Sequence, residues 1–182
     1  LSCTLSLQPR SSGGGGLSWE DRLDHLAKEI QSKLPALYDV EAALLRFPIA
    51  YEESMNTVLT QELLRFNNLI STLNVSLASI QRALKGLVVL SAEIEAAGDA
   101  MVLGQVPAMW AAVAYPSLKP LSSWVIDLLA RLTFLRDWLD RGTAPSVYWI
   151  SGFFFTQAFI TGTIQNYARR QRLPIDQVLV DT

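Results

Sequence analysis

A long stripe of apolar residues runs through the middle of the chain, between residues 52 and 90. The pattern alternates steps of four and three residues, which places the apolar side chains on one face of an α-helix, with Thr, Gln, Glu, Arg, Asn and Ser mostly between them. The stripe consists of Leu59, Leu63, Phe66, Ile70, Leu73, Leu77, Ile80, Leu84 and Leu87. A straight helix of this length would extend about 50–60 Å, so other helices must lie along it to bury one face. We therefore expect a scaffold helix over 52–90, with a kink or slight break at Gly86 and helix again to about Ala97.

Shorter amphipathic segments precede this helix. The pattern predicts one helix over residues 17–34, with Ser18 as its N-cap and Pro35 just after its end. A second helix is expected over 39–46, before Pro48 breaks the pattern.

Further helices are expected after the scaffold helix. Pro107 can begin a short apolar helix, and residues 120–141 form a longer amphipathic one that ends at Gly142, a favourable C-cap. Asp127 and Arg131 lie four residues apart and are expected to pair on its exposed side, a contribution of a few tenths of a kcal/mol.

Residues 147–164 contain no charged side chain and precede the basic sequence ARRQR. Such a run lies at the lower limit for a transmembrane helix, although its glycines and polar residues weaken that interpretation. The alternative is a short strand at 146–150, followed by a buried helix over 152–171 and the start of a β portion after residue 176. The whole pattern predicts a predominantly all-α fold, a multi-helix array with one long helix.

Composition narrows the classes of function. Half of the 182 residues are hydrophobic and 18% are charged, and the net charge of −2 gives no electrostatic footprint for nucleic acid. The single cysteine, Cys3, excludes a disulfide within the chain and suits a reducing compartment. Residues 1–16 are rich in Ser and Gly and are expected to form a flexible linker, and the N-terminus shows no signal peptide.

No pattern in the sequence indicates catalysis or metal binding. His25 is the only histidine and, with one cysteine, leaves no cluster for zinc. No GxxxxGK[ST] sequence is present, and GGGG at 13–16 is followed by Leu-Ser-Trp. Glu93 and Glu95 are two residues apart and would point to different helix faces. We therefore expect no catalytic, cofactor-binding or metal-binding residue. No residue supports the interpretation that the protein is a free-standing enzyme.

Several polar and aromatic groups have simple structural interpretations. The sequence Asn74-Val75-Ser76 matches a glycosylation site, but a helical position makes the match accidental. Three arginines next to Tyr167 could form a patch for RNA or anionic lipid, but at the end of a helix they more often stabilise its C-terminal dipole. These are Arg169, Arg170 and Arg172. Four tryptophans are expected in the core and between helices: Trp110, Trp124, Trp138 and Trp149.

Four longer stretches together resemble the C-terminal region of dynein heavy chains, especially the axonemal (ciliary) ones. They are YEESMNTVLTQELLRFNNL (51–69), RALKGLVVLSAEIE (82–95), VPAMWAAVAYPSLKPLSSWVIDLLARLTFLRDW (106–138) and SVYWISGFFFTQAFITGTIQNYARRQRLPID (146–176). The resemblance covers most of residues 20–180. Thr156 stands where proline is expected, and Ser122 and Ala158 where glycine is common, which affects local geometry only.

The resemblance implies a place in an ATP-driven, minus-end-directed microtubule motor built on a ring of six AAA+ modules. Residues 17–50 would be helices at the end of the sixth module, and 51–182 the helical first half of the C-terminal domain. The family's nucleotide sites lie elsewhere, so ATP and Mg²⁺ would not bind this part and no catalytic residue carries over.

The implied role is that of a non-catalytic structural or regulatory element that braces the ring. Its partners would be the rest of the ring and, through the intact complex, dynein intermediate and light chains and microtubules, with neither nucleic acid nor membrane. The implied location is the cytoplasm and cytoskeleton, in the axoneme of a cilium or flagellum. The competing hypothesis is a membrane-associated helical protein anchored by residues 147–164.

Overall fold

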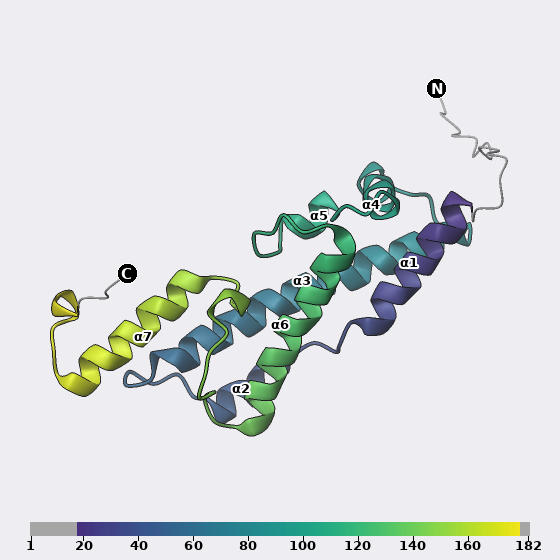
Figure 1. The fold of residues 1–182 in the computed structure, drawn as a ribbon. Helices are drawn as coiled ribbons and strands as arrows, with labels where there is room; N and C mark the ends of the chain where they lie inside the picture. The colour runs from purple at the N-terminus through teal and green to yellow at the C-terminus, as the bar shows by residue number, and fades with distance from the viewer. Residues whose placement is uncertain (1–17, 179–182) are drawn as a thin grey trace.

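The computed structural model describes residues 18–178 and shows an elongated array of helices along one central helix (Figure 1). The helices are α1 (Trp19–Lys33), α2 (Val40–Arg46), α3 (Ser54–Leu84), α4 (Ala92–Val102), α5 (Ala108–Ala111), α6 (Leu121–Arg141) and α7 (Thr156–Gln171), with 3₁₀ turns η1 (Ile150–Gly152) and η2 (Ile175–Gln177). Residues 18–178 contain no β-sheet, only an isolated bridge between Ala50 and Glu53. The predominantly all-α prediction is confirmed.

The central helix α3 buries the predicted apolar stripe. Leu59, Leu63, Phe66 and Leu73 have no exposed surface. The other helices pack around this stripe, with α1 and α4 along one part of α3 and α2 and α7 along another (Figure 1). All of them contribute to one apolar core, because a stripe this long cannot be covered by a single partner.

The long helix ends earlier than its periodicity suggests. Gly86 adopts a left-handed conformation with φ of +71°, and the N–H of Leu87 donates to the carbonyl of Arg82 at 3.0 Å. This hydrogen bond closes the last turn, so the predicted kink is a complete break and Leu87 is exposed. Helix resumes only at Ala92, where Ser91 is the N-cap, and extends beyond Ala97 to Val102.

The predicted helices that flank α3 are present with nearly the expected bounds. Ser18 caps α1, and its Oγ accepts from the N–H of Asp21 at 3.1 Å. Asp39 caps α2 in the same way. Gly142, with φ of +72°, ends α6 as a left-handed C-cap. The residues that preceded and followed each apolar run were therefore sufficient to locate these helices.

The apolar run at 147–164 is not one helix. Its first residues form an irregular segment and the turn η1, and α7 begins only at Thr156, so the expected strand at 146–150 is absent and the helix starts four residues later than 152. Nor is α7 covered on all sides, since Thr161, Tyr167 and Arg170 are exposed. The predicted linker at 1–16 lies outside the described residues. Of the β portion expected after residue 176, Gln177 belongs to the 3₁₀ turn η2 and not to a strand, and residues 179–182 lie outside the described residues.

Across residues 18–178, no helix combines the length and the apolar character needed to cross a bilayer. The anchor predicted at 147–164 is interrupted by η1 and by the start of α7. The membrane-associated alternative is therefore not favoured.

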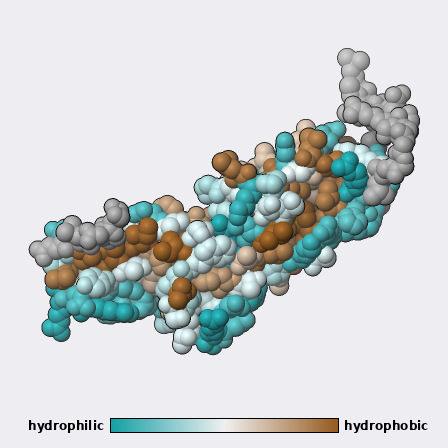
Figure 2. Space-filling model, in the orientation of Figure 1, coloured by the Kyte–Doolittle hydropathy of each residue, from teal (hydrophilic) through white to brown (hydrophobic). Residues whose placement is uncertain are grey.

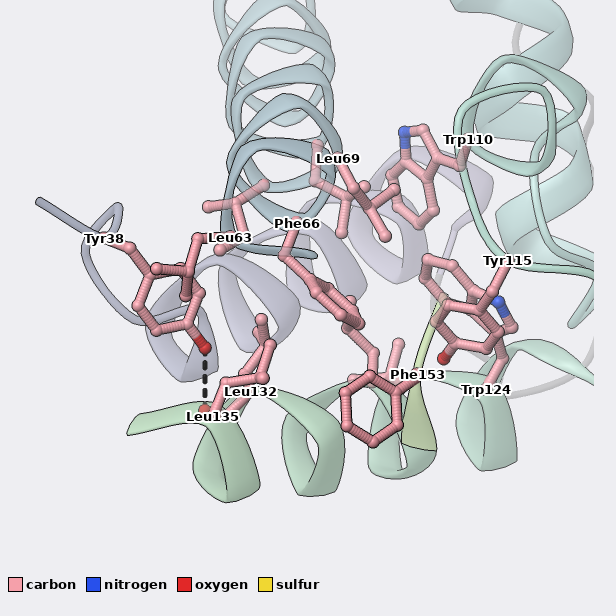
Figure 3. Close-up of a cluster of buried hydrophobic side chains, with 14 of the residues drawn as sticks. Tyr38, Leu63, Phe66, Leu69, Trp110, Tyr115, Trp124, Leu132, Leu135 and Phe153 are labelled. Atoms are coloured by element: carbon pink, nitrogen blue, oxygen red, sulfur yellow. Dashed lines mark hydrogen bonds between the residues drawn. The ribbon is translucent and has the colours of Figure 1, made fainter. Parts of the chain in front are cut away.

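Aromatic side chains fill the core between α3 and α6 (Figure 3). Trp110 and Trp124 are buried and stack with ring centroids 6.0 Å apart, and Trp110 Nε1 donates to Ser76 Oγ at 2.8 Å. Trp138 is also buried, whereas Trp149 is only half-buried. The hydroxyl of Ser76, which belongs to the apparent glycosylation sequence, thus takes part in core packing.

Candidate functional site

The residues with catalytic potential lie apart on the surface. His25 is exposed on α1, and its Nδ1 lies 3.9 Å from Glu29 Oε2. Glu93 and Glu95 are exposed in the first turn of α4. Among residues 18–178, no three His, Cys, Asp or Glu side chains gather in a way that could hold a metal ion. The candidate site must therefore be sought in polar contacts between elements and in surface grooves.

A buried carboxylate on α3 holds the start of α7. Glu62 is 1% exposed, and its two oxygens accept from the backbone N–H groups of Phe154 at 2.5 Å and Phe155 at 3.1 Å. Burial raises the pKa of Glu62, while the two N–H donors favour the charged form and oppose this rise. Phe155 is the N-cap residue of α7 and offers no side-chain cap of its own. Glu62 therefore supplies, from another helix, the anion that an N-terminus attracts.

A second polar cluster joins the first turn of α3 to the last turns of α7. The N–H of Ser54 donates to Asn166 Oδ1 at 2.8 Å, and the Ser54 hydroxyl donates to Gln165 Oε1 at 2.8 Å. The same hydroxyl accepts from Arg169 Nη1 at 2.7 Å, and the amide of Asn166 donates to Glu53 Oε1. These contacts provide hydrogen-bond partners for the buried Asn166 and for the partly buried groups around it, which would otherwise be costly to remove from water.

Between the two clusters, α7 approaches α3 closely at a glycine. A Cβ placed on Gly162 would lie 3.2 Å from Val58 Cγ2 and 3.3 Å from Met55 Sδ. Both distances are shorter than an ordinary contact of a Cβ atom, so any larger residue would require Val58 or Met55 to shift by a few tenths of an ångström. Gly162 thus sets the distance at which the polar clusters on both sides can form.

The arginines at the end of α7 act mainly within the fold. The Arg169 guanidinium lies 4.2 Å from the ring centroid of Tyr51, and Arg170 Nη2 is 3.6 Å from Glu53 Oε2. Arg172 is the C-cap, with φ of +55°. Two of the three arginines therefore contact the α3 region and do not form a separate basic patch.

The predicted pair of Asp127 and Arg131 forms, but it is buried. Arg131 Nε donates to Asp127 Oδ2 at 2.7 Å, and both side chains are close to one-tenth exposed. Lys119 Nζ donates to the other oxygen at 2.5 Å. Burial alone would raise the pKa of Asp127, and the hydrogen bonds from Lys119 and Arg131 outweigh it and lower the pKa. The expectation of an exposed pair was wrong because α6 is covered on this side.

Arg131 connects three segments. Its guanidinium lies 3.8 Å from the ring centroid of Tyr115 and 5.4 Å from that of Trp149, and Nη1 donates to the carbonyl of Phe153 at 3.4 Å. It therefore fixes the segment before α7 against α6, while Glu62 fixes the following residues against α3.

An apolar groove opens between α1, α4 and α6. Its volume is about 370 Å³, and Leu26, Val102, Val125, Ile126 and Leu129 are among the residues that line it. In Figure 2 hydrophobic surface is exposed over the region where α1 and α6 lie side by side in Figure 1. This groove exposes apolar side chains to which an apolar partner could bind.

Sequence reasoning did not identify Glu62. The signal was present, because position 62 lies three residues after Leu59 and four before Phe66, on the apolar face of the helix. A single carboxylate within such a stripe is expected to have a buried partner. Its partners are backbone N–H groups about ninety residues away, and no spacing in the sequence indicates them.

Comparison with known proteins gives consistent results. The family model for the C-terminal domain of the dynein heavy chain matches residues 1–182. The protein is 54% identical over 170 residues to dynein axonemal heavy chain 3 of Homo sapiens, covering 93% of its own length and 4% of that relative. It is 52% identical over 167 residues to dynein axonemal heavy chain 12 of Mus musculus, covering 92% and 5%. It is 48% identical over 177 residues to dynein axonemal heavy chain 1 of Rattus norvegicus, covering 97% and 4%.

Proposed function

The protein belongs to the family formed by the C-terminal domains of dynein heavy chains, and from this premise we propose that it is a non-catalytic structural and regulatory element of an axonemal motor. Its task is to brace the ring of AAA+ modules of an ATP-driven, minus-end-directed microtubule motor in cilia or flagella. The sequence spans only 4–5% of the length of these relatives, so the motor activity belongs to the proposal.

The observation that carries the proposal is the packing of α3. This helix has 31 residues, and α1, α2, α4, α5 and α7 all contact it. Its buried stripe and the polar clusters around Ser54 and Glu62 fix it firmly to these elements. A rod held in this way transmits displacement along its length, as a brace requires.

The same proposal covers the nucleotide, the partners, the location and the division of the chain. ATP and Mg²⁺ bind elsewhere in the heavy chain, and the partners are the rest of the ring, dynein intermediate and light chains, and microtubules. The site of action is the axoneme, within the cytoplasm and cytoskeleton. The division at residues 50 and 51, between the end of the sixth module and the C-terminal domain, stays a prediction.

The test is a substitution in α3 of the intact heavy chain. Phe66 is fully buried, whereas Leu64, two residues earlier on the same helix, is exposed. Phe66→Ala should slow microtubule gliding and reduce microtubule-stimulated ATP hydrolysis while leaving nucleotide binding intact, and Leu64→Ala should change none of these. Unchanged gliding for Phe66→Ala would contradict a bracing role, and loss of nucleotide binding would indicate a direct part in the ATP site.

A further inference from the structure

The groove between α1, α4 and α6 is built by three helices that do not close over it. Its floor is formed by buried apolar residues of each helix, namely Ile30, Met101, Leu121 and Val125. Its walls are less covered, since Leu26 and Leu129 are half-buried and Ile126 is 69% exposed. Water therefore contacts apolar side chains that extend directly from the core.

The polar groups at the groove are few and unequally paired. Glu29 Oε1 and Lys33 Nζ are 2.5 Å apart and neutralise each other. Arg22 is exposed, has no acidic partner within ion-pair distance among residues 18–178, and donates only a long hydrogen bond of 3.4 Å to the carbonyl of Val102. The groove thus presents apolar walls with one unmatched positive charge at its edge.

This chemistry favours a protein segment over a small molecule. Small-molecule sites combine an apolar cavity with several polar groups that point inward, whereas here the polar groups are confined to the edge. An amphipathic helix lying between two helices places apolar side chains into the groove at helical spacing and leaves its polar side chains at the edge. An acidic residue on that helix would meet Arg22.

We propose that this groove binds an amphipathic helix from another part of the same heavy chain, which inserts one or more of Leu, Ile, Phe or Met beside Ile126 and presents Asp or Glu to Arg22. The inference rests on the proposed function, because it names the surface through which the brace contacts the rest of the motor. The relatives supply the source of the helix, since about 95% of their length lies outside the part that this sequence matches.

The test is site-specific photo-crosslinking in the purified intact heavy chain, with p-benzoylphenylalanine in place of Ile126. The control places the same group at Thr133, which is exposed on the same helix about 10 Å farther along and does not line the groove. Position 126 should crosslink to one defined peptide of the same heavy chain that contains apolar residues and an acid, and position 133 should not reach that peptide. The proposal would be overturned if no crosslink formed at position 126. It would also be overturned if the only crosslinks were to residues within 1–182, to a second heavy chain or to another protein.

A charge substitution provides the second measurement. Arg22→Glu should lower the yield of the crosslink at position 126 several-fold, whereas Arg22→Lys should retain most of it. An unchanged crosslink yield for Arg22→Glu would overturn the proposed contact between Arg22 and an acidic residue of the bound helix. The outcome is independent of the bracing test, because crosslinking reports where the groove binds, and the Phe66→Ala variant reports motor activity.

Discussion

The two halves of α3 are covered by contacts of different kinds. In the later half, α1, α4 and α5 pack mainly through apolar and aromatic side chains, with the stacked Trp110 and Trp124 alongside and only isolated side-chain hydrogen bonds, such as that from Trp110 to Ser76. In the earlier half, α7 is held by polar groups around Ser54 and Glu62, and by the close approach at Gly162. The hydrophobic effect has no preferred direction, whereas hydrogen bonds require defined distances and angles. The earlier half of α3 therefore depends more on exact placement.

The starts of α1 and α7 show the same contrast. In α1 the N-cap is Ser18, a residue of the same segment, so the helix can begin without any neighbour. In α7 the N-cap residue is Phe155, and the acceptor is Glu62 on α3. The start of α7 is thus determined by tertiary structure, and α7 is expected to separate from α3 before α1 does.

The largest effect is expected in the apolar half. Trp124→Ala should lower the free energy of unfolding by about 3–5 kcal/mol, because a fully buried indole is replaced by a cavity. Urea unfolding followed by far-UV circular dichroism measures this loss, and Ser123→Ala, at the exposed neighbouring position, is the control. An unchanged midpoint would show that Trp124 is not an anchor between helices.

An intermediate and local effect is expected from Glu62. Glu62→Ala leaves two partly buried N–H groups without their acceptor, at a cost of about 1–3 kcal/mol each. Amide hydrogen exchange should accelerate at least about tenfold in α7 and stay unchanged in α1, since about 1.4 kcal/mol corresponds to a factor of ten. Gln61→Ala, one residue earlier and exposed, is the control. Equal acceleration of exchange in α1 and α7 would contradict the proposed difference between the two halves of α3.

The smallest effect is expected at the other N-cap. Ser18→Ala should cost about 1 kcal/mol and accelerate exchange only in the first turn of α1, because the lost acceptor serves one N–H group. The same exchange measurement detects this change, and Ser18→Asp should restore protection. If the loss of exchange protection spread from α1 into α7, the N-termini of these two helices would be coupled more tightly than their contacts indicate.

Local signals were sufficient to predict most of the helices. Ser18 and Gly142 marked helix ends that the structure contains, and the spacing of apolar residues gave the buried face of α3. The family could be predicted from whole stretches of sequence, because more than half of the aligned residues are identical in one relative.

Long-range polar contacts could not be predicted in the same way. The start of α7 was placed too early because an apolar run does not reveal that its N–H groups bond to Glu62. Arg131 was assigned to the exposed side of its helix because its partners Tyr115, Trp149 and Phe153 come from other segments. These contacts depend on how segments cross, which the period of one helix does not specify.

The length of α3 also gives it the geometry of a lever. Its 31 residues extend roughly 46 Å, so a tilt of about 5° around its centre would move its ends about 2 Å in opposite directions. The hydrogen bond between the Ser54 N–H and Asn166 measures 2.8 Å, and a displacement of this size would break it. A small rotation of α3 would thus displace the Ser54 end, where α7 is bound, much further than the residues at the centre of the helix.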